Sequence, residues 1–295
     1  MEKIFFALPN NEVLTQSLVE KCFAELGKVM IRQFPDGETY IRIESDVQHK
    51  QVFLVCTLDY PDVKIVPLYY LAQTAKELGA QSVHLIAPYL AYMRQDKRFE
   101  RGEGITSAYF AKLLSLFLDS LLTLDPHLHR RNTLSEIYSI PTTTIHTDAV
   151  VSKWIFENVD QPILIGPDAE STQWVAEVAH YNNLPFLILE KTRRGDENVE
   201  ITVPNVDKYL AHTPVLADDI ISTASTMIAT IGHLKKVGMC KPVCIGIHGI
   251  FADNAYANLS AAGAEAIITC NTIPHQSNII KIDDLIASAV NRIKI

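Results

Sequence analysis

Two adjacent carboxylates lead into a run of small hydroxylated residues in the last third of the chain. Asp218 and Asp219 follow the apolar run 215–217, and residues 222–226 read Ser-Thr-Ala-Ser-Thr. A turn that opens a helix aims backbone N–H groups and the positive end of the helix dipole at one point, which suits a phosphate. The carboxylates can accept hydrogen bonds from sugar hydroxyls or hold a divalent cation. The segment predicts a ribose-phosphate site, although Ser and Thr are also ordinary helix caps.

Histidine and aspartate side chains follow two other predicted strands. Asp125, His127 and His129 come after one of them, and Asp168 comes after the next but one. Imidazole suits transition metals, whereas Mg²⁺ prefers oxygen ligands and bound water, so the residue types alone leave a zinc site open at the histidines. Asp168 could hold a divalent cation or cap the helix that follows it.

Cations and a tight turn supply the remaining candidates. Lys191 and Arg193 lie on a flexible excursion after a predicted strand, where cations over a phosphate could stabilise charge during its transfer. Arg94 and Gln95 could read a base and its phosphates. Residues 34–38 form a turn, because they contain Pro and Gly. Each feature also has a plain structural interpretation, as an exposed basic turn, a solvated charged face and a hairpin.

The elements that must position these residues follow a simple rhythm. Short β-branched runs alternate with segments of helical period, which predicts parallel strands joined by crossover helices. Ligands bind such sheets at the carboxyl ends of the strands. The expected strands are 4–8, 52–57, 83–87, 121–124, 142–146, 163–166, 186–189, 215–217, 243–247 and 266–269, and the clearest helices are 12–26, 66–78, 107–118, 172–181, 226–237, 255–262 and 283–293.

This rhythm occurs in both halves of the chain, without any repeat of individual residues. It predicts two α/β domains with a joint near residues 146–148, where no Gly/Ser-rich or Pro-rich linker occurs. We expect a first domain at 1–146, completed by a C-terminal helix at 280–295, and a second domain at 147–279.

Composition and net charge limit the kinds of molecule that the protein is expected to bind. The 295 residues carry a net charge of −8, so the overall field would repel nucleic acid and anionic membranes. The five cysteines are scattered and odd in number, which gives no disulfide framework. The start of the chain does not resemble a signal peptide, and the most apolar stretch is too short to span a bilayer. We therefore expect a cytoplasmic protein that binds neither nucleic acid nor membrane.

The segment Asp218–Thr226 resembles the phosphoribosyl-binding loop shared by type I phosphoribosyltransferases and ribose-phosphate pyrophosphokinases. The chain as a whole is similar to the second family, because further motifs of that family occur in order along it. The resemblance implies an α/β fold of two tandem type I phosphoribosyltransferase domains, each a mainly parallel sheet flanked by helices. The motifs are Phe34-Pro-Asp-Gly-Glu38, Tyr92-Met-Arg94-Gln95-Asp96, Asp125-Pro-His127, Gly166-Pro-Asp168-Ala, Lys191-Thr-Arg193 and Asn271-Thr-Ile-Pro274.

The resemblance also implies an activity and its residues. Members of the family transfer the β,γ-diphosphoryl group of ATP to the 1-hydroxyl of ribose 5-phosphate with Mg²⁺, and assemble as homodimers or higher homo-oligomers in which the turn at 34–38 reaches a neighbouring subunit's ATP. By resemblance, ATP binds Phe34, Asp36, Glu38, Arg94, Gln95 and His127, the metal lies at His127 and Asp168, the catalytic cations are Lys191 and Arg193, and ribose 5-phosphate binds Asp218, Asp219, Ser222, Thr223, Ala224, Ser225 and Thr226.

Four positions depart from the family pattern, among them Ser171, which like Glu170 stands where the family favours a glycine. Ser225 stands where the phosphate loop usually carries Gly, so its Cβ could crowd the phosphate or the backbone of the turn. Ser222 stands where many members carry a third acid, and Glu170 stands where the family favours a glycine. Two alternatives therefore stay open: a non-catalytic regulatory homologue, and a type I phosphoribosyltransferase that acts on a nucleobase.

Overall fold

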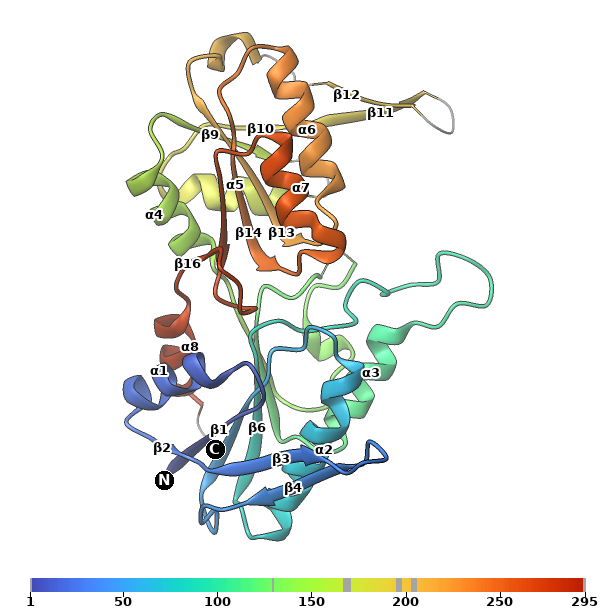
Figure 1. Ribbon diagram of the computed structural model, residues 1–295, viewed down its shortest axis with the longest axis vertical. Coiled ribbons are helices and arrows are strands. Elements are labelled where there is room, and N and C mark those ends of the chain that lie inside the picture. Colours follow the sequence, from blue (N-terminus) through green and yellow to red (C-terminus); the bar gives the residue numbers. More distant parts are fainter. Residues whose placement is uncertain (1, 129, 167–170, 195–197, 203–205, 294–295) are drawn as a thin grey trace. The chain divides into compact units, whose positions relative to one another are not determined.

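The computed structural model describes residues 2–128, 130–166, 171–194, 198–202 and 206–293. The chain divides into two compact units, one made of Met1–Ile145 with Asp283–Ile295 and the other of His146–Ile282 (Figure 1). In the part of the chain that the structure describes, no helix is both long and apolar enough to cross a lipid bilayer.

A parallel sheet forms the centre of the first unit. Its strands β5 and β6 are buried along their whole length, as expected for β-branched runs covered on both faces. Helices α1 and α8 lie on one face of the sheet, and α2 and α3 lie on the other (Figure 1). In spatial order the strands are β2 (Glu25–Leu26), β1 (Lys3–Ala7), β5 (Gln51–Val55), β6 (Ser82–Ala87), β7 (Ser120–Leu124) and β8 (Thr142–Ile145); the helices are α1 (Glu12–Cys22), α2 (Asp62–Glu77), α3 (Thr106–Ser115), η1 (Leu134–Glu136) and α8 (Asp283–Val290).

The second unit repeats this architecture. The connection from its first strand leads to one side of the sheet and later connections lead to the other, so right-handed crossovers place α5 and α6 on opposite faces. In spatial order its strands are β10 (Phe186–Ile188), β9 (Pro162–Gly166), β13 (Thr213–Ile221), β14 (Val243–Gly249), β15 (Ala266–Cys270) and β16 (Asn278–Ile280); the helices are α4 (Asp148–Asn158), α5 (Thr172–Tyr181), η3 (Val206–Tyr209), α6 (Ser225–Lys236), η4 (Ala252–Asn254) and α7 (Ala255–Ala262).

Each unit also carries an antiparallel hairpin. In the sequence it follows the second strand of the main sheet and precedes the third. The first unit has β3 (Val29–Gln33) and β4 (Thr39–Ile43), which confirms the hairpin predicted around residues 34–38. The second unit has β11 (Glu190–Arg194) and β12 (Asn198–Thr202). The two units therefore have the same order of strands and the same order of connections between them, and the hairpin occurs at the same point in both.

The place between β1 and β5, where the connections of the first unit change direction, is filled by side chains. Asn11 is 3% exposed; its Oδ1 accepts a hydrogen bond from the Thr57 backbone N–H at 2.9 Å, and its Nδ2 donates to the Pro9 carbonyl at 3.0 Å. Leu8 and Leu58 are buried beside these residues in the chain. The Asn11 side chain therefore links the loop after β1 to the loop after β5.

Several element boundaries differ from the expectation. Helix α1 ends at Cys22, because Phe23 takes the left-handed conformation and β2 follows. Strand β13 runs on to Ile221, because its pairing with β14 continues to Ile221 opposite Gly249, so Asp218 and Asp219 lie inside the strand. Helix α4 and strand β16 were not predicted.

His84 on β6 is a buried imidazole, 3% exposed. Its Nδ1 lies 2.7 Å from Ser120 Oγ and its Nε2 lies 2.7 Å from Ser82 Oγ. Burial lowers the pKa of His84 to about 4. The two hydroxyls therefore satisfy the ring nitrogens of a neutral histidine.

This burial predicts that the folded protein becomes less stable as the pH is lowered below about 6.5. The unfolded chain protonates His84 near its ordinary pKa of about 6.5, so the stabilisation is complete above that pH, is lost as the pH falls towards 4, and amounts to about 3 kcal/mol at most. Urea unfolding across this range would measure the slope for the native protein and for His84→Gln, which cannot titrate. An equal slope in both proteins would show that other groups cause the pH dependence.

Candidate functional site

The sequence segment 218–226 covers the end of β13, the turn at residues 222–224 and the start of α6. Ala224 takes the left-handed conformation with φ 58°, and α6 begins at the next residue. Among the described residues, no side chain caps this end of α6. The first-turn N–H groups of a helix have no partner within the helix, so this turn has the arrangement that binds a phosphate. We call residues 222–226 the cradle.

Ser225 fits the cradle without backbone strain. It is the first residue of α6 and is not among the residues with positive φ, so the left-handed position of the turn is Ala224. The Thr223 hydroxyl donates a hydrogen bond to Ser225 Oγ at 3.4 Å. The expected conflict between the Ser225 Cβ and the turn's dihedral angles therefore does not occur.

The cradle lies at the point of the second sheet where the connections change direction. From β9 the chain leads to β10 on one side, whereas from β13 it leads to β14 on the other. Open α/β sheets bind their ligands at this point, beyond the carboxyl ends of the two strands. Asp218 and Asp219 are half-buried on β13, and the Asp219 backbone N–H donates to Asp218 Oδ1 at 3.0 Å. Asp168, which follows β9, lies outside the described residues, as does Glu170.

The nucleotide candidates of the first unit lie on loops that follow two adjacent strands, β6 and β7. Arg94 is exposed, and both Gln95 and His127 are half-buried. Arg130 links the two loops, because its guanidinium donates to Asp96 at 3.0 and 3.3 Å. The structure therefore ties the Arg94–Gln95 segment to the segment that carries His127. His129 lies outside the described residues.

Glu103 closes the loop that begins at Gln95. Its Oε2 accepts hydrogen bonds from the backbone N–H groups of Phe99 at 2.7 Å and Glu100 at 3.0 Å, and from Gln95 Nε2 at 3.0 Å. The backbone N–H groups of Glu100 and Phe99 hold the pKa of Glu103 below its ordinary value. Sequence reasoning missed the roles of Glu103, Asp96 and Arg130, because a charged residue gives no sign in the sequence of the partner that it meets in the fold.

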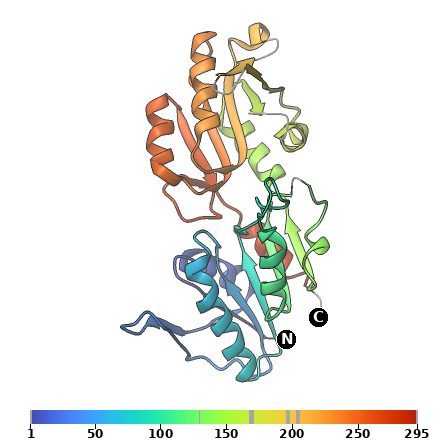
Figure 2. The ribbon, with the colours of Figure 1, turned by 90° about the vertical axis from the view of Figure 1, so that its right-hand side faces the viewer.

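The turn at residues 34–38 forms the tip of the β3–β4 hairpin, which projects from the first unit (Figure 2). Phe34 is 40% exposed, and the Glu38 backbone N–H donates to Asp36 Oδ1 at 3.2 Å. The Arg32 guanidinium lies over the rings of Phe34, at 4.8 Å, and Tyr40, at 4.2 Å. These contacts hold the aromatic ring at the tip in an orientation that leaves part of it open to solvent.

Lys191 and Arg193 lie on an antiparallel ribbon, which the sequence did not predict. Their backbone lies on β11, where Lys191 pairs with Ile201 and Arg193 pairs with Val199. Their side chains lie outside the part of the structure that is described.

The described residues contain no group of three or more His, Cys, Asp or Glu side chains placed to hold a metal ion. Mg²⁺ commonly keeps several waters and takes only one or two carboxylates from a protein, together with substrate phosphates. The half-buried carboxylates of Asp218 and Asp219 beside the cradle are oxygen donors of this kind.

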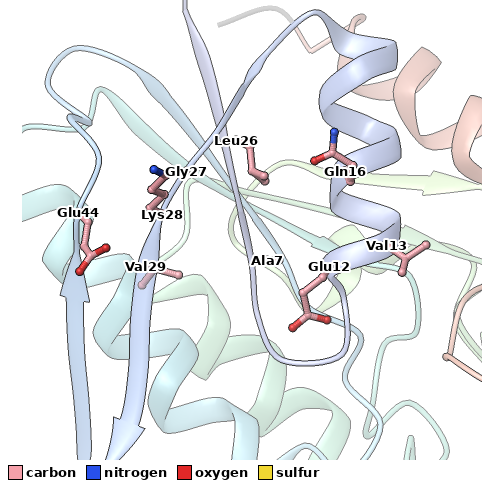
Figure 3. A pocket seen from close by; sticks show the side chains of 9 residues that line it. All are labelled: Ala7, Glu12, Val13, Gln16, Leu26, Gly27, Lys28, Val29 and Glu44. Atoms are coloured by element: carbon pink, nitrogen blue, oxygen red, sulfur yellow. The ribbon is translucent and has the colours of Figure 1, made fainter.

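A separate pocket of about 720 Å³ lies in the first unit, between α1 and the base of the β3–β4 hairpin (Figure 3). None of the residues predicted for the site lines it. Its lining residues are Ala7, Glu12, Val13, Gln16, Leu26, Gly27, Lys28, Val29 and Glu44.

Comparison with known proteins finds one match in each half of the chain. Residues 3–117 match the family described as the N-terminal domain of ribose phosphate pyrophosphokinase, and residues 133–286 match the phosphoribosyl transferase domain. The ribose-phosphate pyrophosphokinase of Saccharolobus solfataricus is 32% identical over 92% of this chain and 93% of its own length. That of Methanopyrus kandleri is 30% identical over 98% of this chain and 99% of its own.

A solved structure shows the same fold. The phosphoribosylpyrophosphate synthetase of Mycobacterium smegmatis superimposes with a TM-score of 0.87 at 20% identity, over 99% of this chain and 98% of that one. The order of strands and the superposition describe one fold, and the sequence matches identify one family. The left-handed turn before α6 lies within the matched phosphoribosyl transferase domain. The chain belongs to the ribose-phosphate pyrophosphokinase family and has its fold of two α/β domains with mainly parallel sheets.

Proposed function

We propose that this protein transfers the β,γ-diphosphoryl group of ATP to the 1-hydroxyl of ribose 5-phosphate, giving phosphoribosyl diphosphate and AMP. The cradle is the observation that carries this proposal. It combines a left-handed turn with a helix N-terminus whose N-cap residue, Ala224, makes no side-chain cap, and it lies beside two half-buried carboxylates at the point where the connections of the second sheet change direction. Family membership then selects ribose 5-phosphate among the ligands that such a cradle fits.

The sugar phosphate binds through the cradle and through the two carboxylates beside it. Its 5-phosphate accepts hydrogen bonds from the first-turn N–H groups of α6 and from the hydroxyls of Ser222, Thr223, Ser225 and Thr226. Ala224 contributes its backbone, because the left-handed turn at this residue directs the chain into the helix. Asp218 and Asp219 accept hydrogen bonds from the ribose hydroxyls, which leaves the 1-hydroxyl as the free end of the sugar.

ATP binds on the first unit, at the loops after β6 and β7. Arg94 contacts its phosphates, Gln95 reads the base or the sugar, and His127 lies near the phosphates. The hydrogen bonds of Glu103 support this assignment, because they hold the Gln95 amide in one place before the nucleotide arrives. A side chain held in this way loses less conformational entropy on binding.

The transfer needs alignment and charge stabilisation more than covalent chemistry. The 1-hydroxyl attacks the β-phosphorus in line, and negative charge spreads over the phosphate oxygens as AMP leaves. Lys191 and Arg193, whose backbone lies on β11, stabilise this charge. Asp168 and His127 would hold Mg²⁺, which neutralises phosphate charge when it is bound.

The proposal includes a homodimer or higher homo-oligomer, in which Phe34, Asp36 and Glu38 complete the ATP site of a neighbouring subunit. The projecting hairpin and the part-exposed Phe34 ring support this role, because an aromatic ring held at the tip by Arg32 can stack on adenine. A cytoplasmic location is also proposed, since all five cysteines are free thiols.

An assay of the full chain with ATP, Mg²⁺ and ribose 5-phosphate tests the proposed reaction. We expect AMP and phosphoribosyl diphosphate to form in equal amounts and only when the sugar phosphate is present. A failure to form AMP at every phosphate and metal concentration would indicate a non-catalytic homologue. Consumption of a nucleobase without any need for ATP would indicate a phosphoribosyltransferase.

Lys191→Ala tests the role of the β11–β12 ribbon. We expect kcat to fall by about 10²–10³-fold while both KM values stay within about threefold, because a transition-state contact is lost. Lys208→Ala, which removes an exposed lysine of the same unit, is the matched control. An unchanged kcat in Lys191→Ala would remove this lysine from the mechanism.

Ser225→Gly tests the departure inside the cradle. We expect the affinity for ribose 5-phosphate, measured by calorimetry, to stay the same or rise, because removal of the Cβ from beside the phosphate and release of the Thr223 hydroxyl from its acceptor offset the loss of the Ser225 hydroxyl. Ser225→Ala keeps the Cβ and removes only the hydroxyl, so the pair of variants separates crowding from hydrogen bonding. Weaker binding in Ser225→Gly would contradict the expectation.

A further inference from the structure

Ile221 joins the strand β13 to the cradle, and its backbone is held by the neighbouring strand. Its carbonyl accepts two hydrogen bonds, one from the Ile250 N–H and one from the Phe251 N–H, each at 3.0 Å. Both donors lie directly beyond the end of β14. The residue before Ser222 is therefore fixed by a part of the chain that contributes none of the residues predicted to contact the sugar phosphate.

The side chain of Ile221 is held from the same strand. A Cβ placed on Gly246 would lie 2.6 Å from Ile221 Cγ1 and 2.7 Å from Cδ1, which is closer than real atoms approach. Ile221 is 1% exposed and belongs to a buried cluster that includes Ala224 and Met227. The side chain can occupy this position only because residue 246 is glycine.

The donor Phe251 is itself fixed on two sides. A Cβ on Gly249 would lie 2.5 Å from Phe251 Cε2, so this glycine leaves room for the ring. On the other side the ring centroid lies 4.5 Å from that of His275 and 5.3 Å from that of Tyr256. Packing on both sides therefore sets the direction in which the Phe251 N–H points.

The loop after β14 also carries backbone strain. Phe251, Asp253 and Asn254 have φ values of 49°, 52° and 59°, in the left-handed region that side chains other than glycine rarely adopt. Such residues persist only where their surroundings impose the conformation, and they concentrate at functional sites. Here the strained loop follows the strand next to β13, and its first residue holds the carbonyl that precedes the cradle.

We propose that Gly246 and Phe251 are positioning residues for the ribose 5-phosphate cradle, acting through Ile221. Gly246 leaves room for the Ile221 side chain, and Phe251 holds its carbonyl, so the cradle hydroxyls and the first turn of α6 start from a fixed point. This inference rests on the proposed function. It adds that affinity for the sugar phosphate depends on residues of β14 and the loop after it that do not touch the ligand.

Gly246→Ala tests the proposal, with Gly232→Ala as its matched control. Gly232 lies in α6, and a Cβ there meets nothing within 4 Å. We expect Gly246→Ala to raise the KM for ribose 5-phosphate by about tenfold or more, with kcat and the KM for ATP within about threefold, because only ground-state binding of the sugar is lost. Gly232→Ala should leave all three constants unchanged.

A second substitution tests whether the effect passes through Ile221. Ile221→Ala removes Cγ1 and Cδ1, the two atoms that the new Cβ would meet, so Gly246→Ala combined with Ile221→Ala should recover most of the lost affinity. Phe251→Leu should raise the same KM selectively, and Phe251→Tyr, which keeps the ring, should not. Calorimetry with ribose 5-phosphate alone gives the same comparison without turnover.

The outcomes separate this inference from the proposed function. If the native protein forms phosphoribosyl diphosphate but Gly246→Ala leaves the KM for ribose 5-phosphate unchanged, or shifts both KM values equally, the positioning role is wrong and the function stands. Loss of folded protein in both Gly246→Ala and Phe251→Leu would assign these residues to stability alone and would also overturn the inference. A native protein that neither binds ribose 5-phosphate nor forms AMP would overturn the proposed function itself.

Discussion

The parallel ladder between β13 and β14 is the constraint on which the second unit depends. It runs from Val215 opposite Val243 to Ile221 opposite Gly249, well beyond the apolar run that begins β13. The extension keeps Asp218 and Asp219 within the sheet and brings the strand to an end at the residue before the cradle. The left-handed turn at Ala224 then starts α6. The ladder therefore fixes the two carboxylates and the N-terminus of α6 relative to each other.

The sequence predicted the strands that are buried on both faces, because an apolar β-branched run such as the one in β5 has few other stable arrangements. It also predicted the hairpin tip from its Pro and Gly. It failed where a distant partner decides the conformation. Strand β13 continues because β14 pairs with it, and α1 stops early because Phe23 turns the chain into β2. Local patterns contain neither fact.

The candidate site shows the same division. The residues of the cradle could be found from their types and spacing, and family resemblance supplied the roles of Arg94 and His127. The groups that support them could not be found, because Glu103 and Asp96 are ordinary exposed-type acids until the fold gives each its donors. The left-handed φ of Ala224 was equally invisible, since nothing in an alanine signals that its neighbours will impose strain.

The two units repeat one topology, yet the ends of their sheets are used differently. In the first unit the loop after β5, which corresponds to the cradle in the order of elements, contains the buried Leu58 and is bonded to Asn11 through the Thr57 N–H. A duplicated domain therefore does not imply a duplicated binding site. The chain is therefore symmetric in its topology and asymmetric in the residues that follow corresponding strands.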